Sequence, residues 1–87
     1  MIYVFDIDGT ICYTKNGDYN MSIPIQDRID KINDLRKQGN TILFWTARGM
    51  GRSGNSVDYA YINFEELTKK QLENWGVKYD GLFLGKP

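Results

Sequence analysis

Three short apolar runs, separated by stretches of helical periodicity, constrain the fold of this chain most strongly. The runs occupy residues 2–6, 41–46 and 82–84. Between them, apolar residues recur every three or four positions, which is typical of amphipathic helices. Strands that alternate with helices favour a parallel sheet with right-handed crossovers. We therefore predict an α/β fold, a Rossmann-like parallel sheet with flanking helices.

Individual residues predict where the elements begin and end. Pro24 suits the first turn of the first helix, and Gly39 suits the position just after its last turn. Ser56 or Asn55 is the expected N-cap of the second helix, which we expect to end near Trp75. Each helix then forms the crossover between two consecutive strands.

A short insertion separates the first strand from the first helix. It carries the turn signal Asn16-Gly17, with Ile11-Cys12-Tyr13 before it and Tyr19-Asn20-Met21 after it. Asn-Gly between such flanks is typical of a β-hairpin. We predict a hairpin flap over residues 11–21.

Composition limits the classes of function. A length of 87 residues supports one domain, residues 1–87, with modest burial. Eleven basic and eleven acidic residues cancel, so there is no global field for nucleic acid or an anionic membrane. The absence of histidine excludes histidine catalysis, and Cys12 is the single cysteine, which is compatible with a reducing, cytoplasmic location. We expect no membrane partner, because Asp6 interrupts the first apolar run too early for a signal peptide or membrane span.

Polar residues follow each of the three runs. Asp6 and Asp8 end the first, Thr46 ends the second, and Lys86 follows the third. The carboxyl ends of parallel strands meet at one edge of a sheet, where ligands bind. Gly9 permits a sharp backbone turn after the acids. Two acids at a strand end are costly to desolvate without a partner, and an oxygen-rich site suits Mg²⁺.

These residue types fit phosphoryl transfer. A carboxylate can attack phosphorus and form an aspartyl phosphate, and Asp6 is the better-fixed candidate. Asp8, on the turn, can protonate the leaving group and later activate water. Thr46 offers a hydroxyl to a phosphoryl oxygen, and Lys86 offers positive charge to the transition state.

The same residues resemble a known family. Asp6-Ile7-Asp8-Gly9-Thr10, Thr46 at a strand end, and Lys86 in Gly-Lys-Pro resemble the first three signature motifs of the haloacid dehalogenase (HAD) superfamily of phosphohydrolases. The resemblance implies Asp6 as nucleophile, Asp8 as acid and base, Thr46 as phosphate ligand and Lys86 as stabilising cation. It also implies Mg²⁺ as cofactor, with Asp6 and the backbone carbonyl of Asp8 as metal ligands.

One part of the family pattern is not present. The fourth motif lies after the motif lysine and supplies further metal ligands, whereas this sequence stops at Pro87. We therefore expect a shortened version of a longer protein that lacks one or more C-terminal strands, with residues 2–6 at an open apolar edge. The short insertion implies a capless member with an open site. Such sites accept larger substrates or are closed by another subunit, so a homo-oligomer remains an alternative.

The loop after Thr46 carries two arginines and several glycines. We expect Arg48, with Thr46 and Gly9, to bind the substrate phosphate; Arg48 and Arg52 have the alternative of being solvated surface residues. Residues 49–54 match the spacing G-x-G-x-x-G literally. Because three residues separate that motif from the strand, we favour a substrate-facing loop over a dinucleotide site.

The sequence thus predicts a Mg²⁺-dependent phosphomonoester hydrolase that acts on a small phosphorylated substrate, with a sugar phosphate as one candidate. A nucleic-acid 3′-end phosphatase is an alternative, suggested by the open site and by Arg48 and Arg52, although nucleic acid is not the favoured partner. A non-catalytic fragment that binds phosphate or a partner is a third, suggested by the missing fourth motif.

Overall fold

The structure is a computed structural model that describes residues 1–51 and 53–87. Its elements follow one another as β1 (Ile2–Phe5), β2 (Cys12–Tyr13), a 3₁₀ helix η1 (Tyr19–Met21), β3 (Ile23–Pro24), α1 (Gln26–Lys37), β4 (Thr41–Thr46), α2 (Val57–Asn74) and β5 (Gly81–Leu84). The main sheet has the strand order β1-β4-β5, and both pairings are parallel. The predicted α/β architecture with a Rossmann-like parallel sheet is confirmed.

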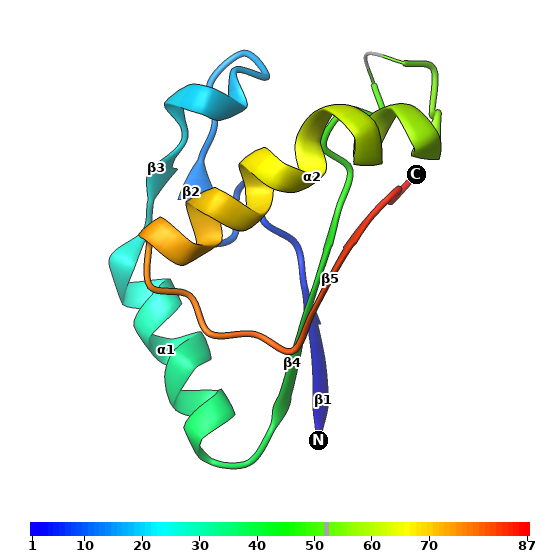
Figure 1. The fold of residues 1–87 in the computed structure, drawn as a ribbon. Coiled ribbons are helices and arrows are strands. Elements are labelled where there is room, and N and C mark those ends of the chain that lie inside the picture. The colour runs from blue at the N-terminus through cyan, green and yellow to red at the C-terminus, as the bar shows by residue number, and fades with distance from the viewer. Residues whose placement is uncertain (52) are drawn as a thin grey trace.

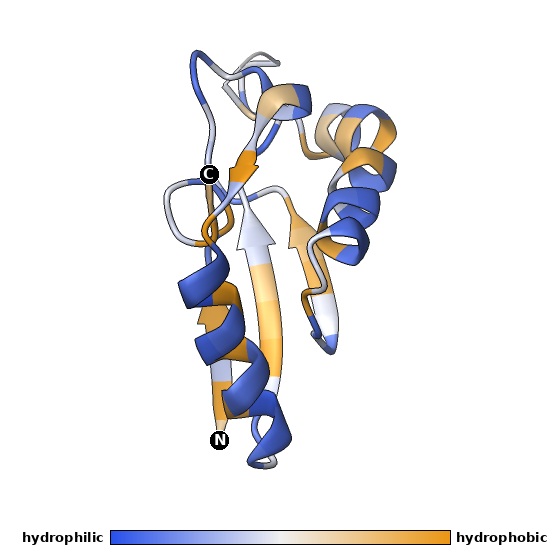
Figure 2. Ribbon diagram, turned by 90° about the vertical axis from the view of Figure 1, so that its left-hand side faces the viewer, coloured by the Kyte–Doolittle hydropathy of each residue, from blue (hydrophilic) through white to orange (hydrophobic). Residues whose placement is uncertain are grey.

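The two crossovers place α1 and α2 on the same face of the sheet (Figures 1 and 2). This follows from the strand order, because both right-handed connections advance in one direction across the sheet. The buried residues of α1 are Ile29 and Ile32, and those of α2 include Ala60, Phe64 and Leu72. The helices therefore flank one side of the sheet.

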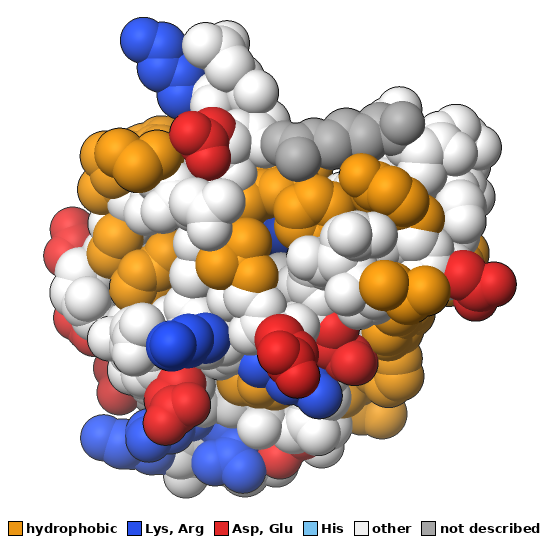
Figure 3. Space-filling model, turned by 45° about the horizontal axis from the view of Figure 1, so that its top comes forward, with side chains coloured by type: hydrophobic (Ala, Val, Ile, Leu, Met, Phe, Trp, Pro, Cys, Tyr) orange, Lys and Arg blue, Asp and Glu red, His pale blue; other side chains and the backbone are white. Residues whose placement is uncertain are grey.

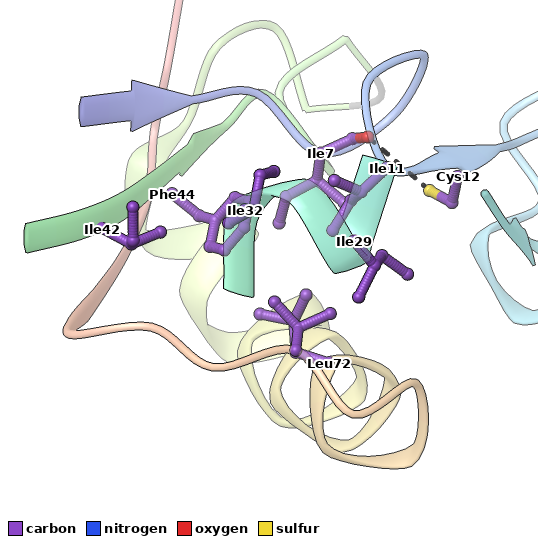
Figure 4. Close-up of a cluster of buried hydrophobic side chains, with 9 residues drawn as sticks. Ile7, Ile11, Cys12, Ile29, Ile32, Ile42, Phe44 and Leu72 are labelled. Atoms are coloured by element: carbon purple, nitrogen blue, oxygen red, sulfur yellow. Dashed lines mark hydrogen bonds between the residues drawn. The ribbon is translucent and has the colours of Figure 1, made fainter. Parts of the chain in front are cut away.

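The core lies between the helices and the inner sheet face. Ile42 and Phe44 of β4 pack there with Ile29 of α1 and Leu72 of α2, all with no exposed surface (Figure 4). Burying one such side chain stabilises a fold by about 1.5–3 kcal/mol. A second cluster contains Met50, Ala60, Phe64 and Leu84 and packs the loop after β4 against α2.

The outer sheet face remains exposed in the described structure. Val4, Trp45 and Phe83 project from three adjacent strands and are 58%, 42% and 50% exposed. They line a shallow apolar pocket of about 410 Å³. β1 pairs only with β4 among the described strands, so it forms the expected apolar edge.

Most predicted boundaries are confirmed. β4 covers residues 41–46, Ser56 caps α2 by accepting the backbone N–H of Tyr59 at 3.2 Å, and Gly39 follows α1 with φ of +94°. Gly39 adopts this left-handed conformation because a helix commonly ends with such a residue, and glycine has no side-chain penalty there.

The hairpin prediction is right about the turn and wrong about one strand. Asn16 and Gly17 have positive φ angles of 56° and 69°, as an Asn-Gly turn requires. The returning strand is β3 and not residues 19–21, which form η1. Pro24 pairs with Cys12 across this small sheet instead of opening α1. Proline is tolerated there because β3 is an edge strand. We call residues 12–24, comprising β2, η1 and β3, the flap.

Candidate active site

A polar pocket of about 290 Å³ lies between the flap and the carboxyl ends of β1 and β4. Its lining residues are Asp6, Asp8, Thr14, Gly17, Tyr19, Ala47 and Arg48. The chain after β1 supplies the two acids, the chain after β4 supplies Ala47 and Arg48, and the flap supplies the rest. Parallel sheets commonly bind ligands here, because the loops that follow the parallel strands all lie at the carboxyl edge of the sheet.

Lys86 reaches one of the two acids. Its Nζ donates to Oδ2 of Asp6 at 3.0 Å, and its backbone N–H donates to the carbonyl of Thr46 at 3.2 Å. The preceding Gly85 has φ of +93°, and a Cβ there would lie 2.9 Å from a methyl carbon of Val57. Glycine is therefore needed to turn the chain so that the ammonium group faces Asp6.

Asp8 is bound from several sides. Oδ1 accepts hydrogen bonds from Thr14 Oγ1 at 2.6 Å and from Arg48 Nη2 at 3.0 Å, and Oδ2 accepts from Arg48 Nε at 3.0 Å. Burial by itself raises the pKa of Asp8, but the hydrogen bonds from Arg48 and Thr14 and the charge of Arg48 outweigh it, so the pKa lies below its ordinary value. Asp8 is consequently held as a carboxylate.

Arg48 is buried although it lines the pocket. Its side chain has no exposed surface, and its guanidinium forms a bidentate pair with Asp8. Nη1 donates to Gln71 Oε1 at 2.6 Å and to Thr68 Oγ1 at 3.2 Å, both on α2. Each of its three nitrogens therefore already donates to the protein. Phosphate binding by Arg48, as the sequence predicted, would require an exchange of these bonds.

Tyr19 fixes the flap over the pocket. Its ring lies 4.8 Å from the Arg48 guanidinium carbon and packs edge-on against Phe64, with ring centroids 5.1 Å apart. Its hydroxyl accepts the backbone N–H of Gly49, and its carbonyl accepts from the Gln71 side chain. The flap is thus tied to the loop after β4 and to α2.

Thr46 and Gly9 occupy the predicted positions in the chain without lining this pocket. Thr46 ends β4 but is fully buried, and its Oγ1 accepts the backbone N–H of Arg48 at 3.2 Å. Gly9 turns the chain after Asp8 with φ of +82°, and its N–H donates to the carbonyl of Cys12. In this structure both residues shape the backbone around the acids, and their contact with a phosphate stays a prediction.

Several site residues have only a weak signal in the sequence. Thr14 and Ser22 are ordinary flap residues by pattern, yet Thr14 bonds both Asp8 and Ser22. Thr68 and Gln71 are polar residues on the otherwise apolar face of α2, and that anomaly was detectable. Cys12 packs in the core, and its thiol also donates to Asp8 at 3.5 Å. Burial and the nearby Asp8 charge raise the pKa of this thiol.

The donor set is compatible with Mg²⁺. No group of three or more acidic, cysteine or histidine side chains that could hold a metal occurs in residues 1–51 and 53–87. Mg²⁺, however, often uses one or two protein carboxylates and fills its other positions with water and substrate phosphate. Asp6, which lines the pocket and is partly exposed, is such a carboxylate, and metal ligation by the backbone carbonyl of Asp8 stays a prediction.

Arg52, the second arginine that suggested nucleic-acid binding, lies outside the described residues, and Arg48 offers no exposed charge. The viewed face of the molecule carries acidic and basic side chains interspersed rather than one basic patch (Figure 3). The glycine-rich loop also differs from a dinucleotide motif, because α2 begins at Val57, after the last glycine, Gly54. None of the described helices is both long and apolar enough to span a bilayer.

Comparison with known proteins defines the fold. No protein-family model matches this chain, and no curated protein sequence matches it. A structural-genomics target from Vibrio cholerae matches with a TM-score of 0.93 and 28% identity, over 99% of this chain and 70% of that one. A D,D-heptose 1,7-bisphosphate phosphatase from B. bronchiseptica, whose crystal structure contains magnesium and phosphate, matches with a TM-score of 0.62 and 16% identity. That match covers 95% of this chain and 48% of the phosphatase. The chain therefore shares its α/β fold with these two proteins.

Proposed function

We propose that this protein is a Mg²⁺-dependent phosphomonoester hydrolase that works through an aspartyl-phosphate intermediate. One observation carries the proposal: Asp6 and Asp8 line one pocket, and Lys86 forms a 3.0 Å ion pair with Asp6 at the carboxyl end of the sheet. The HAD-like fold, found also in a heptose bisphosphate phosphatase, supports the same chemistry. A small phosphorylated substrate suits a pocket of about 290 Å³.

In the first step, a carboxylate oxygen of Asp6 attacks phosphorus, and the bond between phosphorus and the leaving oxygen breaks. Lys86 places positive charge beside the attacking carboxylate, where the phosphoryl oxygens gather charge. The protonated form of Asp8, which its lowered pKa makes the minor form at neutral pH, donates its proton to the leaving oxygen. Mg²⁺, held by the Asp6 carboxylate and the Asp8 carbonyl, would lower the repulsion between carboxylate and phosphate.

In the second step, water attacks the phosphorus of the aspartyl phosphate. Asp8 takes a proton from that water, and the Asp6 carboxylate is released together with phosphate. The lowered pKa of Asp8 favours the carboxylate that this step needs. Asp8 therefore changes role between the two steps as its protonation changes.

The test is phosphate release from a panel containing an aryl phosphate, sugar phosphates and a 3′-phosphorylated oligonucleotide, with and without Mg²⁺. We expect wild-type turnover that requires Mg²⁺ and is abolished by Asp6→Asn. Asp27→Asn is the matched control, because Asp27 is an exposed acid on α1. Undiminished activity of Asp6→Asn would refute the nucleophile, and preference for the oligonucleotide would favour the nucleic-acid alternative. Phosphate binding without turnover would favour the non-catalytic alternative.

A further inference from the structure

We infer that Arg48 is a positioning residue that fixes the carboxylate of Asp8 for proton transfer and does not itself bind the substrate phosphate; this inference rests on the proposed function. Its basis is geometric. Nε and Nη2 donate to the two oxygens of Asp8, each at 3.0 Å, so the pair is bidentate. A bidentate pair defines the plane of a carboxylate as well as its place.

The guanidinium is itself immobilised by α2. Nη1 bonds Gln71 Oε1 at 2.6 Å and Thr68 Oγ1 at 3.2 Å, and both partners are buried. Polar side chains at these two core positions are costly unless hydrogen-bonded, and Arg48 supplies their partner. The position of Asp8 therefore depends on α2, because α2 holds Arg48 and Arg48 holds Asp8.

Binding a substrate phosphate would demand a different arrangement. An arginine that receives a phosphate presents free N–H groups toward the ligand. Here the side chain has no exposed surface, and Nη2 also faces Ser22 Oγ at 3.5 Å and Cys12 Sγ at 3.8 Å. The positive charge available to the phosphoryl group then comes from Lys86, whose side chain is 36% exposed.

The general-acid role of Asp8 gives this inference a specific signature. The leaving oxygen of an alkyl phosphate needs a proton, whereas p-nitrophenyl phosphate releases the weakly basic p-nitrophenolate without that help. A displaced Asp8 should therefore slow the alkyl ester more than the aryl ester. The ratio of the two kcat/KM values is independent of the folded fraction, so a loss of stability alone would not change it.

The experiment compares wild type with Arg48→Lys, which keeps a charge but loses the bidentate fork. We expect the alkyl-to-aryl ratio of kcat/KM to fall at least threefold, with the inhibition constant of inorganic phosphate changed less than threefold. A smaller fall in the ratio, or a rise of threefold or more in the inhibition constant, would overturn the positioning role. Arg36→Lys is the matched control, because Arg36 pairs with Asp80 outside the pocket.

A second variant keeps Arg48 itself if Arg48→Lys does not fold. Gln71→Met removes the 2.6 Å acceptor of Nη1, together with the donor to the Tyr19 carbonyl, and leaves both bonds to Asp8. We expect the same directional fall in the ratio at unchanged phosphate inhibition, and an unchanged ratio would overturn the inference. Wild-type protein inactive on both esters would instead refute the proposed function, and with it this role.

Discussion

Lys86 and Asp6 form an ion pair with Nζ and Oδ2 3.0 Å apart, although eighty positions separate them in the chain. The pair joins the loop after β5 to the loop after β1. These two strands are not neighbours in the sheet, because β4 lies between them. Both side chains remain partly exposed, at 36% and 40%. They are thus held together while still accessible to a ligand in the pocket.

Replacing Lys86 should reduce activity far more than stability. We expect Lys86→Met to lower kcat by about 10²–10³-fold, as removal of one transition-state donor commonly does. The free energy of unfolding should change by less than about 1 kcal/mol, because partly exposed ion pairs contribute little. Steady-state kinetics and urea unfolding measure the two effects. Lys70→Met, at an exposed position of α2, should change neither.

Gly85 should be intolerant of a side chain. In Gly85→Ala, the new Cβ would lie 2.9 Å from Val57 Cγ1 at a φ of +93°. We expect a loss of about 1–3 kcal/mol in unfolding free energy, together with reduced kcat as Lys86 shifts. Urea unfolding and kinetics test both. Gly51→Ala is the control, because a Cβ there meets nothing within 4 Å; equal damage in that variant would refute the explanation.

Asp80 should contribute stability that disappears in acid. The backbone N–H of Ile42 and the Arg36 side chain lower its pKa in the folded chain. Between the folded and unfolded pKa values, the unfolded state therefore binds more protons, and stability rises with pH. Asp80→Asn should therefore lower the free energy of unfolding by its largest amount at pH 6, and this loss should become progressively smaller below about pH 4.

Urea unfolding of both proteins across that pH range measures the Asp80 difference. Asp34→Asn, at an exposed position of α1, should show a much smaller dependence on pH. A constant difference between wild type and Asp80→Asn from pH 6 to pH 3 would contradict the prediction.

The exposed sheet face should promote self-association of this chain. Val4, 58% exposed on the edge strand β1, shares an apolar pocket with Trp45 and Phe83. A charge on an edge strand opposes edge-to-edge pairing. We expect Val4→Lys to lower the apparent mass at high concentration in sedimentation velocity. Ile62→Lys, on the surface of α2, should have no comparable effect, and equal effects would indicate that overall charge is responsible.

The sequence was sufficient for local features of the fold. The apolar run 41–46, the cap at Ser56 and the turn at Asn16-Gly17 all depend on residues close in the chain, and all occur as predicted. The second flap strand was misplaced because its location depends on distant partners. Tyr19 lies in η1 and is hydrogen-bonded to Gln71 and Gly49. The strand that pairs with β2 is therefore formed by residues 23–24.

The motif acids were likewise visible in the sequence, since their spacing and their place after a strand are local properties. What tertiary structure decided is the partner of each acid: Lys86 for Asp6, and Arg48 for Asp8. Arg48 has no sequence feature that separates a phosphate ligand from a buried support. Only packing decides, because the polar groups of Thr68 and Gln71 on α2 need a hydrogen-bond donor and the buried guanidinium supplies it.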